Sequence, residues 1–128
     1  MVLTVREVAL LSQAELTQAD IEYFRRKYGL LFIRALRAVE EGRVAKYHFE
    51  PSGSAAWIVR GLRREYFVIP ETYCSCRSFY QSVVIARKAD TCYHLLAQRI
   101  AEARKSYATV NSTDVERRSL YVSWRRTD

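Results

Sequence analysis

The N-terminal part of the chain carries apolar residues at helical spacing. Apolar side chains recur every three or four positions and so share one face of a helix. They are Ile21, Phe24, Tyr28, Leu31, Ala35, Leu36 and Val39. Gly29 interrupts this series just after three basic residues, which suit the last turn of a helix. The pattern therefore predicts two helices, over residues 18–28 and 30–41, after a shorter helix over residues 6–14.

The middle of the chain shows the alternation of β-strands. Tyr47 and Phe49 share one face, and the Glu-Pro-Ser-Gly-Ser sequence that follows them is a strong turn signal. A second turn signal begins at Gly61 and separates two more apolar runs, the last of which Pro70 ends. The pattern predicts a three-stranded antiparallel β-meander over residues 44–72.

The C-terminal part returns to helical spacing. Leu96, Ile100, Ala103 and Tyr107 recur at intervals of four, three and four residues. They predict a helix over residues 92–108, with Thr91 as its N-cap.

Two further helices are expected around it. Thr113 and Glu116 have the spacing of a capping box before a helix over residues 114–123. The apolar segment 78–87 is expected to form a short helix.

The order of these elements indicates an α+β fold in a single domain of 128 residues. We expect four successive parts: a helical part (1–43), the β-meander (44–72), a cysteine-containing segment (73–108) and a C-terminal helix (112–124).

All three cysteines of the chain lie close to one of its two histidines. Cys74 and Cys76 are two residues apart, and after fifteen intervening residues come Cys92 and His94. Three thiolates and an imidazole are the ligands of a closed tetrahedral Zn²⁺ site. Residues two apart share a face of a strand but not of a helix. We therefore expect the first pair on an extended segment or at the tip of a β-hairpin, Cys92 just before a helix and His94 in its first turn, so that the metal ion staples this hairpin or loop to the helix.

Other roles for the cysteines are less consistent with the pattern. One alternative is that the cysteines are buried apolar residues without a metal ion. A second alternative, a closed set of disulfides, is disfavoured because the number of cysteines is odd. A catalytic metal ion needs an open coordination position, and four protein ligands leave none. The acids nearest the cluster in sequence are Glu71 and Asp90. The sequence therefore predicts a structural Zn²⁺ ion and no catalytic site.

A C-x-C pair followed by a C-x-H pair resembles the SWIM zinc finger. The longer pattern is similar to the small SWIM-domain subunit of Shu-type recombination complexes, in its archaeal-like form. The residues that carry this resemblance are Tyr73 to Cys76, Phe79, Ser82-Val83, Arg87 to Asp90, Cys92 and His94 to Ala97, with weaker matches at Tyr28-Gly29, Ala35-Leu36 with Val39, and Pro51 to Gly53. Two positions depart from it: Arg77 replaces a frequent proline, and Tyr93 replaces a frequent lysine.

The resemblance implies a function in homologous recombination and DNA repair. It implies a non-enzymatic accessory subunit that forms a heterodimer with a RecA-like recombinase paralogue and binds single-stranded or forked DNA within that complex. The partner would supply the ATP site, since this chain contains neither G-x-x-x-x-G-K nor G-x-G-x-x-G.

The net charge of +7, from 21 basic and 14 acidic residues, favours an anionic partner such as nucleic acid. Arginine-rich surfaces also occur in the ion-pair networks of thermophilic proteins. Arg77, Arg87 and Lys88 are the candidates for phosphate contacts, because the metal site would order the loop that carries them. Such contacts position a nucleic acid without reading its sequence.

Two alternative functions remain open: a stand-alone nucleic-acid-binding module or regulator, and a protein-interaction scaffold whose charge is incidental. Unpaired cysteines suit a reducing cytoplasm, where a prokaryotic chain would associate with the nucleoid, or a nucleus. The sequence has no apolar run approaching the roughly 20 residues of a membrane span, and Arg6 and Glu7 interrupt the apolar N-terminal segment.

Overall fold

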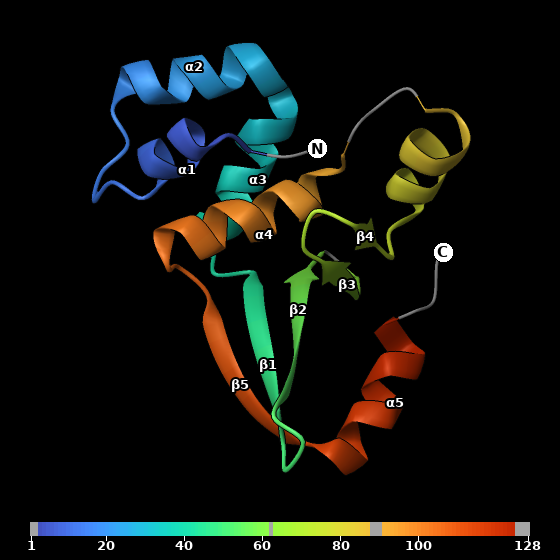
Figure 1. Ribbon diagram of the computed structural model, residues 1–128. Helices are drawn as coiled ribbons and strands as arrows, with labels where there is room; N and C mark the ends of the chain where they lie inside the picture. Colours follow the sequence, from blue (N-terminus) through green and yellow to red (C-terminus); the bar gives the residue numbers. More distant parts are fainter. Residues whose placement is uncertain (1–2, 62, 88–90, 125–128) are drawn as a thin grey trace.

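The computed structural model describes residues 3–61, 63–87 and 91–124, and these form an α+β fold, as predicted (Figure 1). The helices are α1 (Val5–Leu11), α2 (Gln18–Tyr28), α3 (Leu30–Glu40), the π-helix η1 (Phe79–Ile85), α4 (Tyr93–Arg104) and α5 (Asp114–Trp124). The strands are β1 (Val44–Glu50), β2 (Ser54–Arg60), β3 (Glu65–Ile69), β4 (Tyr73–Cys74) and β5 (Ala108–Thr113). Within the described ranges, no helix is long and apolar enough to cross a membrane.

Capping residues set the starts of the first two helices. Thr4 and Glu7 form a capping box at α1, and Thr17 and Asp20 form another at α2. The helix predicted over residues 6–14 ends earlier, at Leu11. The hydroxyl of Ser12 donates a hydrogen bond of 2.7 Å to the carbonyl of Val8, and such a side chain competes with the helical backbone.

Gly29 separates α2 from α3, as its place in the sequence predicts. Its φ of 70° lies in the left-handed region, which glycine adopts without steric cost. The two helices therefore fold back on each other, with the rings of Phe24 and Phe32 stacked 4.9 Å apart.

The described strands form one sheet in the order β4-β3-β2-β1-β5. Strands β1, β2 and β3 pair antiparallel, so the predicted meander is confirmed. Two edge strands extend it: β4 pairs antiparallel with β3, and β5 pairs parallel with β1.

The predicted helix over residues 92–108 is wrong in its last turn. Helix α4 ends at Arg104, Lys105 takes a left-handed conformation with a φ of 53°, and the chain then enters β5. The β-branched residues of this segment favour a strand. An aromatic residue stands at position 107 although the helix has ended. The ring of Tyr107 packs against that of Trp57, with ring centroids 4.8 Å apart.

The two faces of the sheet bury separate groups of side chains. One face packs against α1 to α4 through residues that include Val44, Val59 and Val68. The other packs against α5, where Trp124 lies against Phe49 and neighbouring rings. Figure 1 shows α5 standing apart from the other helices. Its predicted bounds are confirmed to within a residue, and Thr113 accepts the hydrogen bond from the backbone N–H of Glu116.

A fully buried carboxylate joins α1 to α2. Glu7 accepts hydrogen bonds from the side chains of Tyr23 (3.1 Å), Lys27 (2.7 Å) and Tyr28 (3.2 Å). Burial would raise the pKa of Glu7, but these bonds and the one from the backbone of Thr4 outweigh it and hold the pKa below its ordinary value of 4.5.

We expect Glu7→Gln to lower the free energy of unfolding by about 2 kcal/mol at neutral pH, because it removes the charge that the buried donors face. The folded-state pKa of Glu7 is depressed, so its stabilisation is fully present above 4.5 and is lost as the pH falls through the folded-state pKa. Urea denaturation at several pH values should show the two proteins converging in acid. Exposed Glu22→Gln is the control, and a pH-independent difference would contradict this role for Glu7.

Candidate metal centre

The C-x-C pair lies at the edge of the sheet, where β4 ends. Cys74 pairs with Val68 in the ladder between β3 and β4. Ser75 forms two hydrogen bonds with Phe67 of β3, both of 3.0 Å. Its backbone N–H donates to the carbonyl of Phe67, and its hydroxyl accepts from the backbone N–H of Phe67. Cys76 follows on the same side as Cys74. The extended geometry expected from their spacing is confirmed for Cys74, while Cys76 lies in a bend just after the strand.

The C-x-H pair lies at the start of α4, as predicted. Cys92 is the N-cap residue, with extended backbone angles, and His94 lies in the first turn. Thr91 was predicted as the N-cap and is not. Its hydroxyl donates a hydrogen bond of 3.2 Å to the carbonyl of Cys92, which orients the backbone just before the helix.

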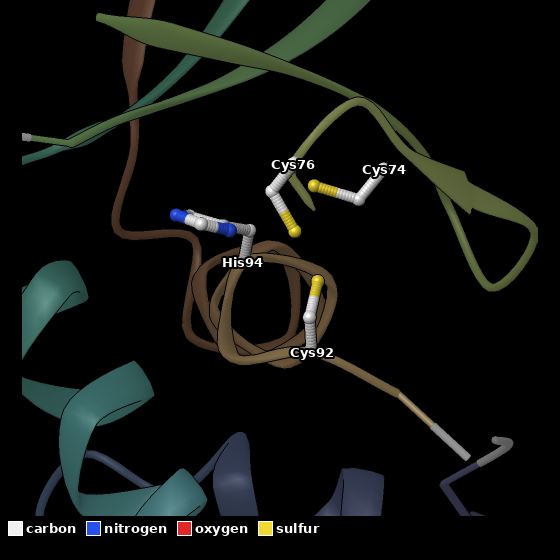
Figure 2. A group of neighbouring side chains, drawn as sticks. All are labelled: Cys74, Cys76, Cys92 and His94. Carbon is white, nitrogen blue, oxygen red and sulfur yellow. The ribbon is translucent and has the colours of Figure 1, made fainter. Parts of the chain in front are cut away.

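The structure brings all four side chains together from these two elements. Their ligand atoms lie within 4.8 Å of one another, and every one of the four residues is buried. Figure 2 shows Cys74 and Cys76 approaching from the sheet edge, Cys92 and His94 from α4, and the three sulfur atoms converging. Folding thus joins residues that the sequence separates by fifteen positions.

The chemistry of this cluster fits a divalent metal ion. Both ring nitrogens of His94 are buried without a hydrogen-bond partner in the described part of the chain, which is unfavourable, and ligation of a metal ion would satisfy one of them. A tetrahedral Zn²⁺ ion with Zn–S bonds of about 2.3 Å would hold its sulfur ligands about 3.8 Å apart. The observed limit of 4.8 Å is close to that spacing. Four protein ligands give the ion a closed, structural coordination shell.

The three thiols are joined to one another by hydrogen bonds. Hydrogen bonds from Cys74 and Cys92 hold the pKa of Cys76 well below that of an ordinary thiol. The same bond to Cys76 raises the pKa of Cys74, and burial adds to the rise. The backbone N–H of Phe79 also donates to the sulfur of Cys76, at 3.2 Å. The cluster therefore stabilises a thiolate, which is the form that binds metals.

Two tyrosines and an ion pair surround the cluster. The rings of Tyr66 and Tyr93 pack against His94, with centroids 4.3 and 4.0 Å away. Glu71, one of the two nearby acids, forms an ion pair of 3.2 Å with Arg99 of α4. This pair is a second link between the sheet edge and α4. Asp90, the other acid, lies outside the described residues.

Two of the three candidate phosphate-binding residues lie within the described part of the chain. Arg77 is exposed and lines a hollow beside the cluster, together with Cys76, Cys92 and His94. Arg87 is exposed at the end of the loop that contains η1, with a φ of 53°. Lys88 lies outside the described residues.

Sequence reasoning missed other basic residues at this hollow. Arg34 of α3 and the pair Arg63-Arg64 line it with Arg77. The adjacent arginines in a turn were visible in the sequence, but their nearness to the cysteines depends on how the sheet folds.

Comparison with known proteins supports the metal-binding interpretation. No family model matches the chain. The chain is similar to a protein of Dictyostelium discoideum named zinc finger SWIM domain-containing protein 7 homolog, with 28% identity over 91 residues. The match covers 70% of this chain but only 58% of the relative, so the chain spans less than two thirds of that protein's length. A SWIM zinc-finger relative and a buried Cys₃His cluster together indicate a zinc-binding module.

We expect Cys92→Ser to lower the zinc content from about one equivalent per chain to less than half. Loss of the ion should lower the free energy of unfolding by roughly 4 kcal/mol or more, since it leaves buried polar ligands unpaired. The face of the sheet under α5 packs separately and should stay folded. Elemental analysis and denaturant melts measure both effects.

Ser78→Ala is the matched control, because Ser78 is exposed and adjacent to the cluster but is no ligand. A Cys92→Ser protein that keeps its zinc or melts like the unmodified protein would overturn the structural role of the ion.

Proposed function

We propose that this chain is a non-enzymatic, zinc-binding accessory subunit in homologous recombination and DNA repair. In this proposal it forms a heterodimer with a RecA-like recombinase paralogue and contacts single-stranded or forked DNA. The observation that carries the proposal is the buried Cys₃His cluster. It is a set of zinc ligands of the kind expected in a chain that is similar to a SWIM zinc-finger protein.

The proposed Zn²⁺ ion has a structural role. Cys74, Cys76, Cys92 and His94 would hold it, and a closed set of four protein ligands leaves no position for water or substrate. The ion would link the sheet edge to α4 and so fix the loop that contains η1 between its two pairs of ligands. An ordered loop of this kind can present side chains to a partner or to DNA.

A partner is supported by apolar residues on η1 that are exposed in the described part of the chain. Tyr80, Val84 and Ile85 are 53%, 47% and 63% exposed. They belong to the same short helix within the segment between the metal ligands. Grouped apolar side chains on a surface are typical of a protein–protein interface. We therefore place the RecA-like partner against this helix.

A DNA contact is supported by the positive charge of the chain and by the exposure of Arg77 and Arg87 at the two ends of the same loop. With Lys88, these residues would bind phosphates and leave the base sequence unread. The same charge also suits the alternative function, a nucleic-acid-binding module without an obligate partner.

Affinity purification of the chain from native lysate, followed by mass spectrometry, tests the partner. We expect a RecA-fold ATPase to be enriched. Ile85→Asp should reduce its recovery roughly tenfold or more, because the substitution places a charge within the proposed apolar interface.

Val115→Asp is the control, since Val115 is an apolar residue of α5 that is 83% exposed. An unmodified chain recovered without a RecA-fold protein would remove the heterodimer and leave the stand-alone module. Equal recovery with both variants would exclude η1 as the interface.

A further inference from the structure

A second hollow adjoins the one beside the metal cluster. The first has a volume of about 510 Å³ and the second of about 330 Å³. Arg34, Gly61 and Tyr93 line both of them. The two hollows therefore form one continuous groove, bounded by α3, the turn between β2 and β3, and the first turn of α4.

Arginines dominate the groove. Arg34, Arg63, Arg64 and Arg77 line the first hollow, whose described lining includes no acidic side chain. Arg37 and Arg43 line the second, where Glu41 pairs with Arg43 at 3.1 Å. Beyond that pair and Arg64, four more guanidinium groups line the groove, those of Arg34, Arg37, Arg63 and Arg77. Such a density of like charge is unfavourable unless an anion offsets it.

Two of these guanidinium groups are held in place by aromatic rings. Arg34 lies 4.3 Å from the centre of the Tyr93 ring, and Arg64 lies 5.0 Å from that of Tyr66. Both rings pack in turn against His94. The positions of the cations are therefore fixed through the metal site, which reduces the conformational entropy that binding would cost.

The metal cluster accounts for only part of this charge. A Zn²⁺ ion with three thiolates and a neutral imidazole carries a net charge of about −1. One arginine would balance it, and the groove holds several more. The remaining positive potential suits a ligand with more than one negative charge.

We infer that this groove binds the phosphate backbone of a nucleic-acid strand. The inference rests on the proposed function and gives its DNA contact a location, extending from Arg77 across to α3. Guanidinium groups bind phosphate oxygens in pairs of hydrogen bonds. Arg34 and Arg37 lie one helical turn apart on α3. Arg63, in the connection between β2 and β3, lines the first hollow with Arg34, so the three arginines form a row along the groove. A row of cations, of which Arg34 is held by the ring of Tyr93, fits a polymer with one charge per nucleotide.

Salt-dependent binding of a fluorescent single-stranded oligonucleotide tests this site. The zinc-loaded chain is used, alone and in any complex that co-purifies with it. We expect the triple variant R34Q/R37Q/R63Q to bind roughly tenfold or more weakly. The slope of log affinity against log salt should fall by about two, since each phosphate contact on a single strand contributes roughly 0.7.

Two triple variants control for net charge and for folding. R25Q/R26Q/R118Q removes the same charge from exposed positions that line neither hollow, and it should keep the slope of the unmodified chain. R34K/R37K/R63K keeps the cations in the groove and should also keep the slope. Zinc content and melting curves verify that each variant is folded.

The outcomes separate this inference from the function on which it rests. If the unmodified chain binds the oligonucleotide and the two glutamine triples weaken it equally, the groove is not the site, although the DNA contact stands. If neither the chain nor its complex binds, the DNA contact and the groove both fail. Competition by polyglutamate as strong as that of unlabelled oligonucleotide at equal charge would show a general polyanion site and overturn the nucleic-acid assignment.

Discussion

One cluster of four side chains links the edge of the sheet to α4. It consists of Cys74, Cys76, Cys92 and His94. The first pair is fixed by the ladder between β3 and β4, and the second by the start of α4. Helix α4 packs against α3 and leads the chain back to β5, which pairs with β1. The position of α4 thus relates the N-terminal helices to the sheet. A metal ion bound by all four residues would hold that relation, with the Glu71–Arg99 ion pair as a weaker second link.

Local patterns in the sequence predict the elements that local interactions determine. The sequence correctly predicts the break at Gly29, the cap that Thr113 provides for α5, the alternation in β1 and the gathering of the cysteines with His94. Strand β5 is missed because its partner, β1, lies some sixty residues away, as the pairing of Ala45 with Ala108 shows. The helical spacing of apolar residues in α4 continues as far as Tyr107, which led to a helix predicted too long. The ring of Tyr107 instead packs against Trp57 after the helix has ended. The arginine groove is missed for the same reason, since α3, the turn after β2 and α4 meet only in the folded chain.

The two faces of the sheet have different roles in this account. The face under α5 is an aromatic core centred on Trp124, whose indole N–H donates a hydrogen bond of 3.2 Å to Glu65. The opposite side carries the metal ligands, the groove and the loop with η1. Tyr66 and Tyr93 join the metal ligand His94 to the cations Arg64 and Arg34. Metal binding and the shape of the basic groove are therefore expected to be coupled, while the α5 face provides stability independently of both.

X-ray absorption spectroscopy at the zinc edge of the purified protein tests the Cys₃His coordination, because it reports the ligands of the ion itself. We expect three sulfur neighbours at about 2.3 Å and one nitrogen neighbour at about 2.0–2.1 Å, with no oxygen neighbour. A spectrum with fewer sulfur neighbours and an added water oxygen would contradict a closed Cys₃His site, as would the absence of a zinc edge in protein purified without chelator.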